Sequence, residues 1–510
     1  MTASNWIAGD FDASKAVRLY KPAIVDGVKV GYDAVTQQSV NAAFIGRVVP
    51  NSGDRFNGAH QAGNGISDTL TDGNKFKVSP RLGAAVDLTG KQNLVLRGAF
   101  AVLYDRPQGN QVFDLVNNPP GMQSPTLNWG LVRDVAGSTP LYSPLGIQAN
   151  TYEWKLPTVY QWNVGVQYKL PHEMSLDVAY IGSKSENLLQ FRNLNAIPYG
   201  TTYQAVNQDP TKGTCVGCTA PGALPGQNAL STEFLRKYQG FNDIRLWEFE
   251  AYSDYKALQT TITRRFGKGL TGSFYYTRSS AKGTLGGDWD YARIDGRDRE
   301  ANYGPLSFDR PHVFTGYFIY QTPKLTTGVL SYIVDSWQLT GNYRWSYGSP
   351  ASAGFSIPGV GNTTYTGSYT EGARIVLKGD PGKGYNSDDP YHQFNIDAFT
   401  APRVGTIGLD SPRVYFWNPP TNNLDLSLSK VFPIGEDRKG LELRADAFNA
   451  LNHTQYSGVN RTINYKSYDD LTIQNLPFKA DGSINNINGV GTVNGTRSPR
   501  TLQLVLRFTF

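Results

Sequence analysis

The sequence predicts an all-β protein whose strands form an antiparallel transmembrane β-barrel. The first observation is a series of segments in which apolar and polar residues alternate, as side chains do on the two faces of a strand. The second is that the connections between these segments are alternately short and long. Barrels of the outer membrane have short periplasmic turns and long extracellular loops, so this alternation favours a barrel over a soluble all-β fold.

The last segment, R-T-L-Q-L-V-L-R-F-T-F over residues 500–510, is the third observation. Its length and alternation are those of one membrane-crossing strand. It ends on an aromatic residue at the carboxyl terminus, where a soluble chain rarely exposes apolar surface. The pattern resembles the terminal assembly signal of bacterial outer-membrane proteins. The residues that carry it share one face of the strand: Leu502, Leu504, Leu506, Phe508 and Phe510.

The chain divides into a loop region, residues 1–77, and strands with their loops, residues 78–510. The first part is rich in Gly, Asn and Asp, and within it Val28–Tyr32 and Val40–Val49 are expected to pair locally. We expect it to be extracellular, with the first strand descending toward the periplasm and the last ending there. The predicted strands are Val78–Asp87, Asn93–Tyr104, Thr158–Leu170, Met174–Ser183, Tyr252–Phe266, Leu270–Ser280, Pro311–Gln321, Ser336–Tyr347, Leu424–Phe432, Leu441–Leu451 and Arg500–Phe510.

Composition agrees with a barrel and argues against other classes. Charged residues are 18% and aromatic residues 12%, and no apolar run is long enough for a transmembrane helix. The net charge of +6 is spread along the chain without a basic run, so nucleic-acid binding is not indicated. The first ten residues show neither a basic nor an apolar stretch, and no signal peptide is predicted.

Several motifs together resemble the barrel of Oar-like TonB-dependent outer-membrane receptors. They occur in the same order over most of the chain: S-P-R-L-G-A-A-V-D-L-T-G-K-Q-N-L-V-L-R-G-A-F, Y-K-A-L-Q-T-T-I-T-R-R-F-G-K-G-L, F-D-R-P-H-V-F, W-Q-L-T-G-N-Y-R-W-S-Y-G-S-P, L-R-A-D-A-F-N-A-L-N-H-T-Q-Y and S-P-R-T-L-Q-L-V-L-R-F-T-F.

The resemblance implies a barrel of about 22 strands with a plug in its lumen. The chain is then expected to supply the C-terminal part, about half of the barrel, without plug or signal peptide. It implies outer-membrane lipid, the barrel-assembly machinery and, through the plug, the TonB energising complex as partners, in the outer membrane of a Gram-negative cell.

Nine charged residues fall on the polar faces of the predicted strands and are expected to face a wet lumen. There they would pair across strands and seat the plug. They are Lys169, Asp177, Arg265, Arg344, Asp425, Glu442, Arg444, Asp446 and Arg507.

Other motifs have simpler interpretations. Cys215 and Cys218 lack the two further ligands of a zinc site and are expected to form a small disulfide, or to remain free thiols. The G-x-G-x-x-G stretch at residues 267–272 precedes a strand rather than a helix, so a hairpin turn is favoured over a dinucleotide site. No G-x-S-x-G nucleophile motif occurs, and neither catalysis nor a cofactor or metal is predicted.

Three functions remain open. The first is energised uptake of a bulky ligand, such as a siderophore or a glycan fragment. The second is an outer-membrane adhesion or secretion-associated scaffold, and the third a soluble, secreted all-β binding protein. Ligand stacking on aromatic residues of the long loops is predicted for Tyr203, Trp247, Trp289, Tyr291, Tyr365 and Trp417.

Overall fold

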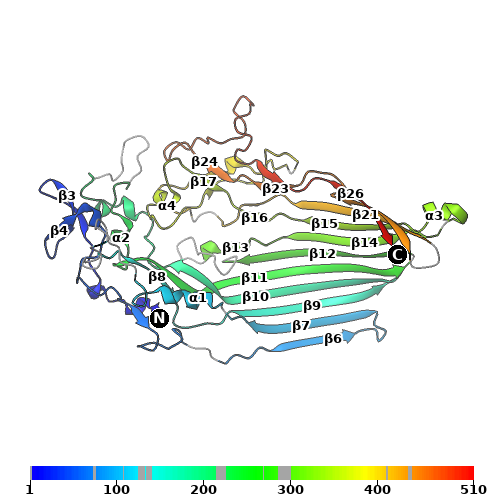
Figure 1. The fold of residues 1–510 in the computed structure, drawn as a ribbon, viewed down its shortest axis with the longest axis horizontal. Helices are drawn as coiled ribbons and strands as arrows, with labels where there is room; N and C mark the ends of the chain where they lie inside the picture. Colours follow the sequence, from blue (N-terminus) through cyan, green and yellow to red (C-terminus); the bar gives the residue numbers. More distant parts are fainter. Residues whose placement is uncertain are drawn as a thin grey trace.

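A computed structural model gives the structure of most of the chain. It describes residues 3–72, 76–106, 108–123, 133, 141–213, 226–267, 269–284, 300–324, 326–386, 388–408, 412–434 and 439–510. Its centre is one large antiparallel sheet in which eleven strands follow one another as a meander (Figure 1). These strands are β6 (Arg81–Asp87), β7 (Leu94–Tyr104), β9 (Thr158–Leu170), β10 (Met174–Asn193), β11 (Phe241–Gly267), β12 (Leu270–Gly283), β14 (His312–Gln321), β15 (Gln338–Ser346), β21 (Thr421–Pro433), β22 (Gly440–Phe448) and β26 (Thr501–Thr509).

All eleven predicted strands are confirmed, and most bounds differ by a few residues. The exceptions are β10 and β11, which extend about ten residues further into the predicted loop 184–251. The alternation of apolar and polar residues is lost there, because a bulge between Ser185 and Leu188, with Asn187 at φ 54°, interrupts the pairing of β10 with β11. A bulge places an extra residue in one strand and so disrupts the period of two. The hairpin therefore continues well beyond the 9–11 residues that cross a bilayer.

One face of the sheet is apolar across all its strands. Because directly paired residues share a face, the strand pairings trace rows of neighbours over the sheet. The side chains in these rows are exposed or partly exposed, none of them is buried, and Leu504 is 81% accessible. A continuous exposed apolar band is the lipid-facing surface of a transmembrane barrel. One row consists of Leu504, Ala445, Leu428, Leu339, Tyr320 and Leu270. A second row consists of Val86, Leu96, Val166, Val178, Thr260, Tyr276, Phe314 and Trp345.

The opposite face is polar. One row on it runs Asp177, Thr261, Tyr275, Thr315, Arg344, Asn423. The two outermost strands, β6 and β26, each pair with one neighbour among the described residues. No helix in the described part of the chain is long and apolar enough to cross a membrane.

The long loops fold into their own small elements beyond one end of the sheet, while the C-terminus lies at the other end (Figure 1). Before the sheet come β1 (Ser4–Trp6), paired with β5 (Ala59–Gln61), and a three-stranded sheet of β2 (Lys21–Val25), β3 (Val28–Asp33) and β4 (Gln38–Asn41). The predicted extended piece Val40–Val49 is wrong beyond Asn41. There Asn41 Oδ1 accepts from Ala43 N at 3.0 Å and caps a 3-10 turn.

The remaining elements are short. Leu145–Asn150 forms β8, which runs parallel to the outer end of β11 and packs Ile147 and Ala149 against Trp6 and Ile244. The others are β13 (Gly304–Pro305), β16 (Pro350–Ala351), β17 (Gly354–Ser356), β18 (Val376–Leu377), β19 (Phe399–Thr400), β20 (Phe416–Trp417), β23 (Tyr456–Val459), β24 (Thr462–Asn464), β25 (Val493–Thr496), α1 (Asn110–Phe113), α2 (Thr232–Leu235), α3 (Ser331–Val334) and α4 (Asn362–Tyr365).

The loops after β15 and β22 together enclose a hydrophobic core, which we call the outer-loop core. β17 pairs with β24 and joins the two loops. Ile463 and Val490 are fully buried, and Phe394 stacks on Phe416 with ring centroids 4.6 Å apart. Its buried members are Ala351, Ala353, Ile357, Tyr365, Ile375, Phe394, Ala398, Phe399, Ala401, Phe416, Val459, Ile463, Tyr465 and Val490.

Candidate functional site

The strand pairings place the predicted lumen-facing charges on the polar face. Glu442 lies directly opposite Arg507, Arg444 opposite Val505 and Asp446 opposite Gln503. Lys169 pairs with Ser175, Asp177 and Arg344 belong to the polar row described above, and Asp425 lies opposite Asn342. Arg265 lies at an irregularity between Arg264 and Gly267, where its backbone N–H donates to Glu173 O at 3.2 Å. That this face lines a lumen remains a prediction.

Some of these charges form ion pairs. Arg97, which was not among the predicted residues, reaches Asp177 at 2.6 Å. Arg444 lies 2.8 Å from Asp446. Asp425 accepts hydrogen bonds from the backbone N–H of Asn449 at 2.9 Å and from the side chain of Asn423 at 2.9 Å. The polar face is therefore partly organised by pairing within the sheet.

Lys430 is a charged residue on the apolar face. It pairs with Leu443, is 4% exposed, and donates from Nζ to the backbone oxygen of Asp335. Its ammonium lies 5.6 Å from the ring centroid of Trp337 and 5.3 Å from that of Phe432. Carbonyl and cation–π contacts compensate a cation on this face at the short-turn end of the sheet.

The aromatic residues predicted to stack on a ligand differ in their burial: some lie in hydrophobic clusters, and one lines a pocket. Trp247 and Tyr365 are 1% and 2% exposed in hydrophobic clusters, so stacking by these two was a wrong prediction. Burial raises the pKa of Tyr365 to about 12, and its hydroxyl donates to Pro402 O at 2.6 Å. Tyr203 donates its hydroxyl to Tyr365 O at 2.7 Å, and burial raises its pKa as well. Of the six, Trp417 lines a pocket.

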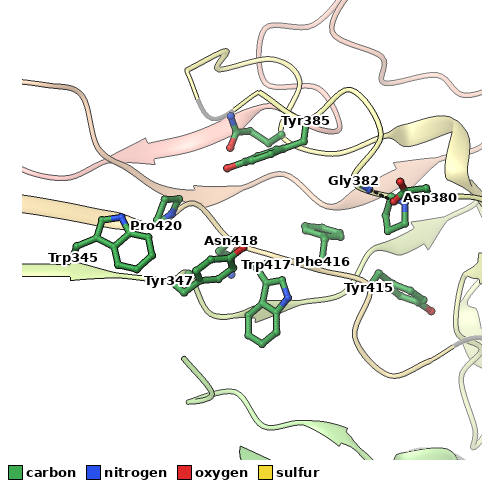
Figure 2. Close-up of a pocket in the computed structure, with 13 residues that line it drawn as sticks. Trp345, Tyr347, Asp380, Gly382, Tyr385, Tyr415, Phe416, Trp417, Asn418 and Pro420 are labelled. Carbon is green, nitrogen blue, oxygen red and sulfur yellow. Dashed lines mark hydrogen bonds between the residues drawn. The ribbon is translucent and has the colours of Figure 1, made fainter. Parts of the chain in front are cut away.

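That pocket, which we call the aromatic pocket, is a cavity of about 560 Å³ at the outer end of β15 and β21 (Figure 2). In Figure 2 Tyr385 lies on one side of it, and Trp345, Tyr347 and Trp417 on the other. Its walls come from the strand ends, β20 and the loop 380–393. The lining residues are Trp345, Tyr347, Gly348, Asp380, Pro381, Gly382, Tyr385, Gln393, Tyr415, Phe416, Trp417, Asn418 and Pro420.

Three rings form one wall of the aromatic pocket. Tyr347 stands nearly perpendicular to Trp345, at 6.1 Å and 85°, and to Trp417, at 5.9 Å and 84°. Gly348 allows the close chain approach behind them, because a Cβ there would lie 1.7 Å from the backbone oxygen of Asn418. Edge-to-face rings fix one another while leaving ring faces available for contact.

The polar groups of the aromatic pocket are few. Among the described residues that line it, Asp380 is the only charged side chain, and its Oδ1 accepts from Gly382 N at 2.8 Å. Gln393 is 3% exposed and donates through Nε2 to Asn386 O and Asp389 O, at 3.2 and 2.6 Å. These two bonds orient the amide and leave Oε1 buried without a hydrogen-bond partner. Burial beside Tyr347 raises the pKa of Tyr385, so its hydroxyl stays protonated at neutral pH.

A second cavity, of about 670 Å³, adjoins the aromatic pocket because Tyr415 lines both. It is more polar, with Glu371, Arg374 and Arg413 among its lining residues. Arg413 Nη1 donates to Thr284 O at 2.9 Å and to Asn302 O at 3.2 Å, and so ties two outer loops together. These hydrogen bonds indicate that Arg413 has a structural role, as a cross-link between the loops.

The remaining predicted site residues are placed as follows. The assembly-signal residues Leu502, Leu504, Leu506 and Phe508 lie on the apolar face of β26, and Phe510 follows it with 93% exposure. Gly267 pairs with Leu270, which gives the hairpin turn expected for the G-x-G-x-x-G stretch. Cys215, Cys218, Trp289 and Tyr291 lie outside the described residues.

Comparison with known proteins agrees with this architecture. Residues 25–503 match a family model described as outer membrane beta barrel domain. A comparison with curated proteins gives no match.

Solved structures with a similar fold include outer-membrane proteins of two species. They are the outer membrane transporter YddB from Escherichia coli (11% identity, 84% of this chain, 40% of that chain, TM-score 0.41), the ferric-catecholate import receptor Fiu from Escherichia coli K12 (10%, 84%, 34%, 0.35) and the ferric enterobactin receptor PfeA from Pseudomonas aeruginosa (13%, 84%, 39%, 0.37). The chain spans 34–40% of the length of these three structures.

Proposed function

Because the chain belongs to the family of outer membrane β-barrel domains, and so lies in the outer membrane, we propose that it forms part of a TonB-dependent receptor barrel. In this proposal a bulky ligand binds at the outer loops and passes through the lumen. Membrane location excludes the soluble, secreted alternative. Catalysis is not part of the proposal.

The observation that carries the proposal is the division of the eleven strands into one apolar and one polar face. A polar face opposite a lipid-facing band is the inner wall of a barrel that encloses water or a plug. Arg97, Asp177 and Arg344 on this face would contact a plug or passing ligand, and Glu442 and Arg507 would do so nearer the periplasm. Energy would come from the TonB complex, acting through a plug, and insertion would use the barrel-assembly machinery.

Energised uptake is tested in the organism that carries this chain. Deleting the coding region should abolish accumulation of one labelled siderophore or glycan fragment, and a protonophore should stop the same uptake in unaltered cells. Uptake that persists in the deletion strain for every ligand tested, or that ignores the protonophore, would contradict the receptor proposal.

An adhesion or secretion-associated scaffold is the second candidate. The outer-loop core favours it, because a folded, hydrophobically packed loop assembly presents a stable surface for contact with other cells or polymers. Removing residues 350–417 while leaving β15 and β21 in place would separate the two. Loss of cell–cell adhesion with unchanged uptake would support the scaffold, and loss of uptake would support the receptor.

A further inference from the structure

The aromatic pocket lies on the lipid side of the sheet. Trp345 pairs with Phe314 and Asn422 on the apolar face, and the pairing continues outward, because Tyr347 N donates to His312 O at 2.9 Å. Trp345, the described lining residue that belongs to the large sheet, thus places the inner edge of the pocket on the lipid-facing band.

The height of the pocket matches the outer membrane surface. Trp345 is the penultimate residue of β15, and the rings next to it form a belt at the outer strand ends. Tyr276 Oη lies 2.8 Å from His312 Nδ1, and His312 lies 5.9 Å from Tyr347, centroid to centroid. Belts of aromatic residues mark the level of the lipid headgroups. A ligand entering here would come from the headgroup layer of the outer leaflet.

The chemistry of the pocket favours a neutral, hydroxyl-rich ring. Ring faces such as that of Trp417 contact the C–H faces of a sugar and exclude water from them. Asp380 accepts hydroxyl hydrogen bonds but repels phosphate, and no described lining residue is cationic. Gln393 Oε1 lacks a donor, which a sugar hydroxyl would supply. The volume, about 560 Å³, is within the range of small-molecule sites.

We propose that the aromatic pocket binds the uncharged saccharide headgroup of an outer-leaflet glycolipid, with Trp417, Tyr347 and Tyr385 as stacking surfaces and Gln393 and Asp380 as hydroxyl acceptors. The acyl chains then lie along the apolar face below Trp345. This site is separate from the lumen path of the proposed uptake. Its occupant would hold the loop 380–393 against the strand ends.

The test uses the full chain in nanodiscs of phosphatidylglycerol and phosphatidylethanolamine, with and without diglucosyl diacylglycerol. Native mass spectrometry counts glycolipid retained on the released protein. We expect retention by the unaltered chain, and retention about tenfold weaker in Trp417→Leu and in Tyr385→Ala, because each substitution removes a ring that contacts the saccharide; tenfold corresponds to about 1.4 kcal/mol. Trp162→Leu is the matched control, because Trp162 lies on the same apolar face in β9, away from the pocket.

Two results would overturn the proposal. One is equal glycolipid retention by Trp417→Leu, Tyr385→Ala and Trp162→Leu. The other is displacement of the lipid by soluble diglucosylglycerol at the glycolipid's own concentration, because a free saccharide would then be as good a ligand. Folding of each variant is verified by heat-modifiable gel mobility. If Trp417→Leu does not fold, Tyr385→Ala and Gln393→Leu decide the question, with the same expected loss.

Discussion

Arg97 on β7 binds Asp177 on β10 across the intervening strand β9. Its Nη2 lies 2.7 and 2.6 Å from the two carboxylate oxygens. The residue of β9 beside Arg97 is Gly165, which has no side chain to occupy the space between them. One ion pair thus spans three strands on the polar face.

The contribution of this pair should be small but measurable. The side chains are 45% and 24% exposed, and pairs of this kind contribute about 0.2–1 kcal/mol. A double-mutant cycle with Arg97→Gln and Asp177→Asn, followed by urea unfolding in detergent, should give a coupling energy in that range that falls as salt is added. A coupling of zero at low salt would show that the pair is incidental.

Removing the final ring should impair insertion. Phe510 is 93% exposed and stacks on Phe508 at 6.0 Å, so Phe510→Ala removes no core contact. We therefore expect slower assembly with little change in the stability of protein already folded. The measurement is the fraction of heat-modifiable protein in the membrane after induction. Unchanged assembly in Phe510→Ala, with Thr509→Ala as control, would contradict an assembly role.

Acid should destabilise residues 18–49, which include the small sheet of β2, β3 and β4. Asp33 is 3% exposed and accepts from Arg18 at 3.0 Å and from Thr36, and these partners hold its pKa well below the usual carboxyl range. A lowered pKa in the folded state means that the stabilisation is complete above the unfolded value of about 3.9 and is lost as the pH falls below it.

We expect amide exchange over residues 18–49, corrected for its intrinsic pH dependence, to accelerate on acidification below pH ~4. Asp33→Asn should show about tenfold faster exchange already at neutral pH, because Arg18 loses a charged acceptor. Asp26→Asn serves as control, since Asp26 lies in the turn between β2 and β3. Equal rates of amide exchange in Asp33→Asn and in the unaltered chain would contradict a stabilising role for the Asp33–Arg18 pair.

The outer-loop core should unfold separately from the membrane sheet. Ile463 is fully buried in it, and truncating such a side chain costs about 2–5 kcal/mol. Ile463→Ala should therefore make residues 350–417 and 452–496 sensitive to protease while heat-modifiable mobility persists. Ile484→Ala, at a site 63% exposed, should change neither. Loss of the sheet's heat-modifiable mobility in Ile463→Ala would show instead that loops and sheet unfold together.

The strands could be predicted because their information is local. Alternation in Thr158–Leu170 specifies both the strand and its faces, and β9 has the predicted bounds. The outer half of the β10–β11 hairpin could not be predicted, because the bulge after Ser185 breaks the alternation. Those residues are extended because they pair with a distant segment of the chain, and such pairing cannot be predicted from the periodicity of the sequence.

The aromatic pocket depends on contacts between distant segments. Trp417 was a predicted ligand contact, whereas Trp345 and Tyr347 were predicted only as strand residues. Gln393 has no local signal, because its unpaired oxygen results from the folding of the loop 380–393 over the strand ends. Trp247 and Tyr365 were predicted as ligand contacts but are buried in hydrophobic clusters, because an aromatic residue in a loop can equally belong to a loop core.

The most direct test of a sheet with one lipid face and one aqueous face is the accessibility of successive residues along β9 in the membrane. With Cys215 and Cys218 replaced by Ser, a nitroxide is placed in turn at residues 161–168 and exposed to oxygen, which partitions into lipid, and to a water-soluble nickel chelate. We predict an alternating pattern, with Trp162, Val164, Val166 and Tyr168 accessible to oxygen and Gln161, Asn163, Gly165 and Gln167 to nickel. Accessibility to nickel at every position, or no alternation, would contradict a membrane-spanning sheet with one lipid face and one aqueous face.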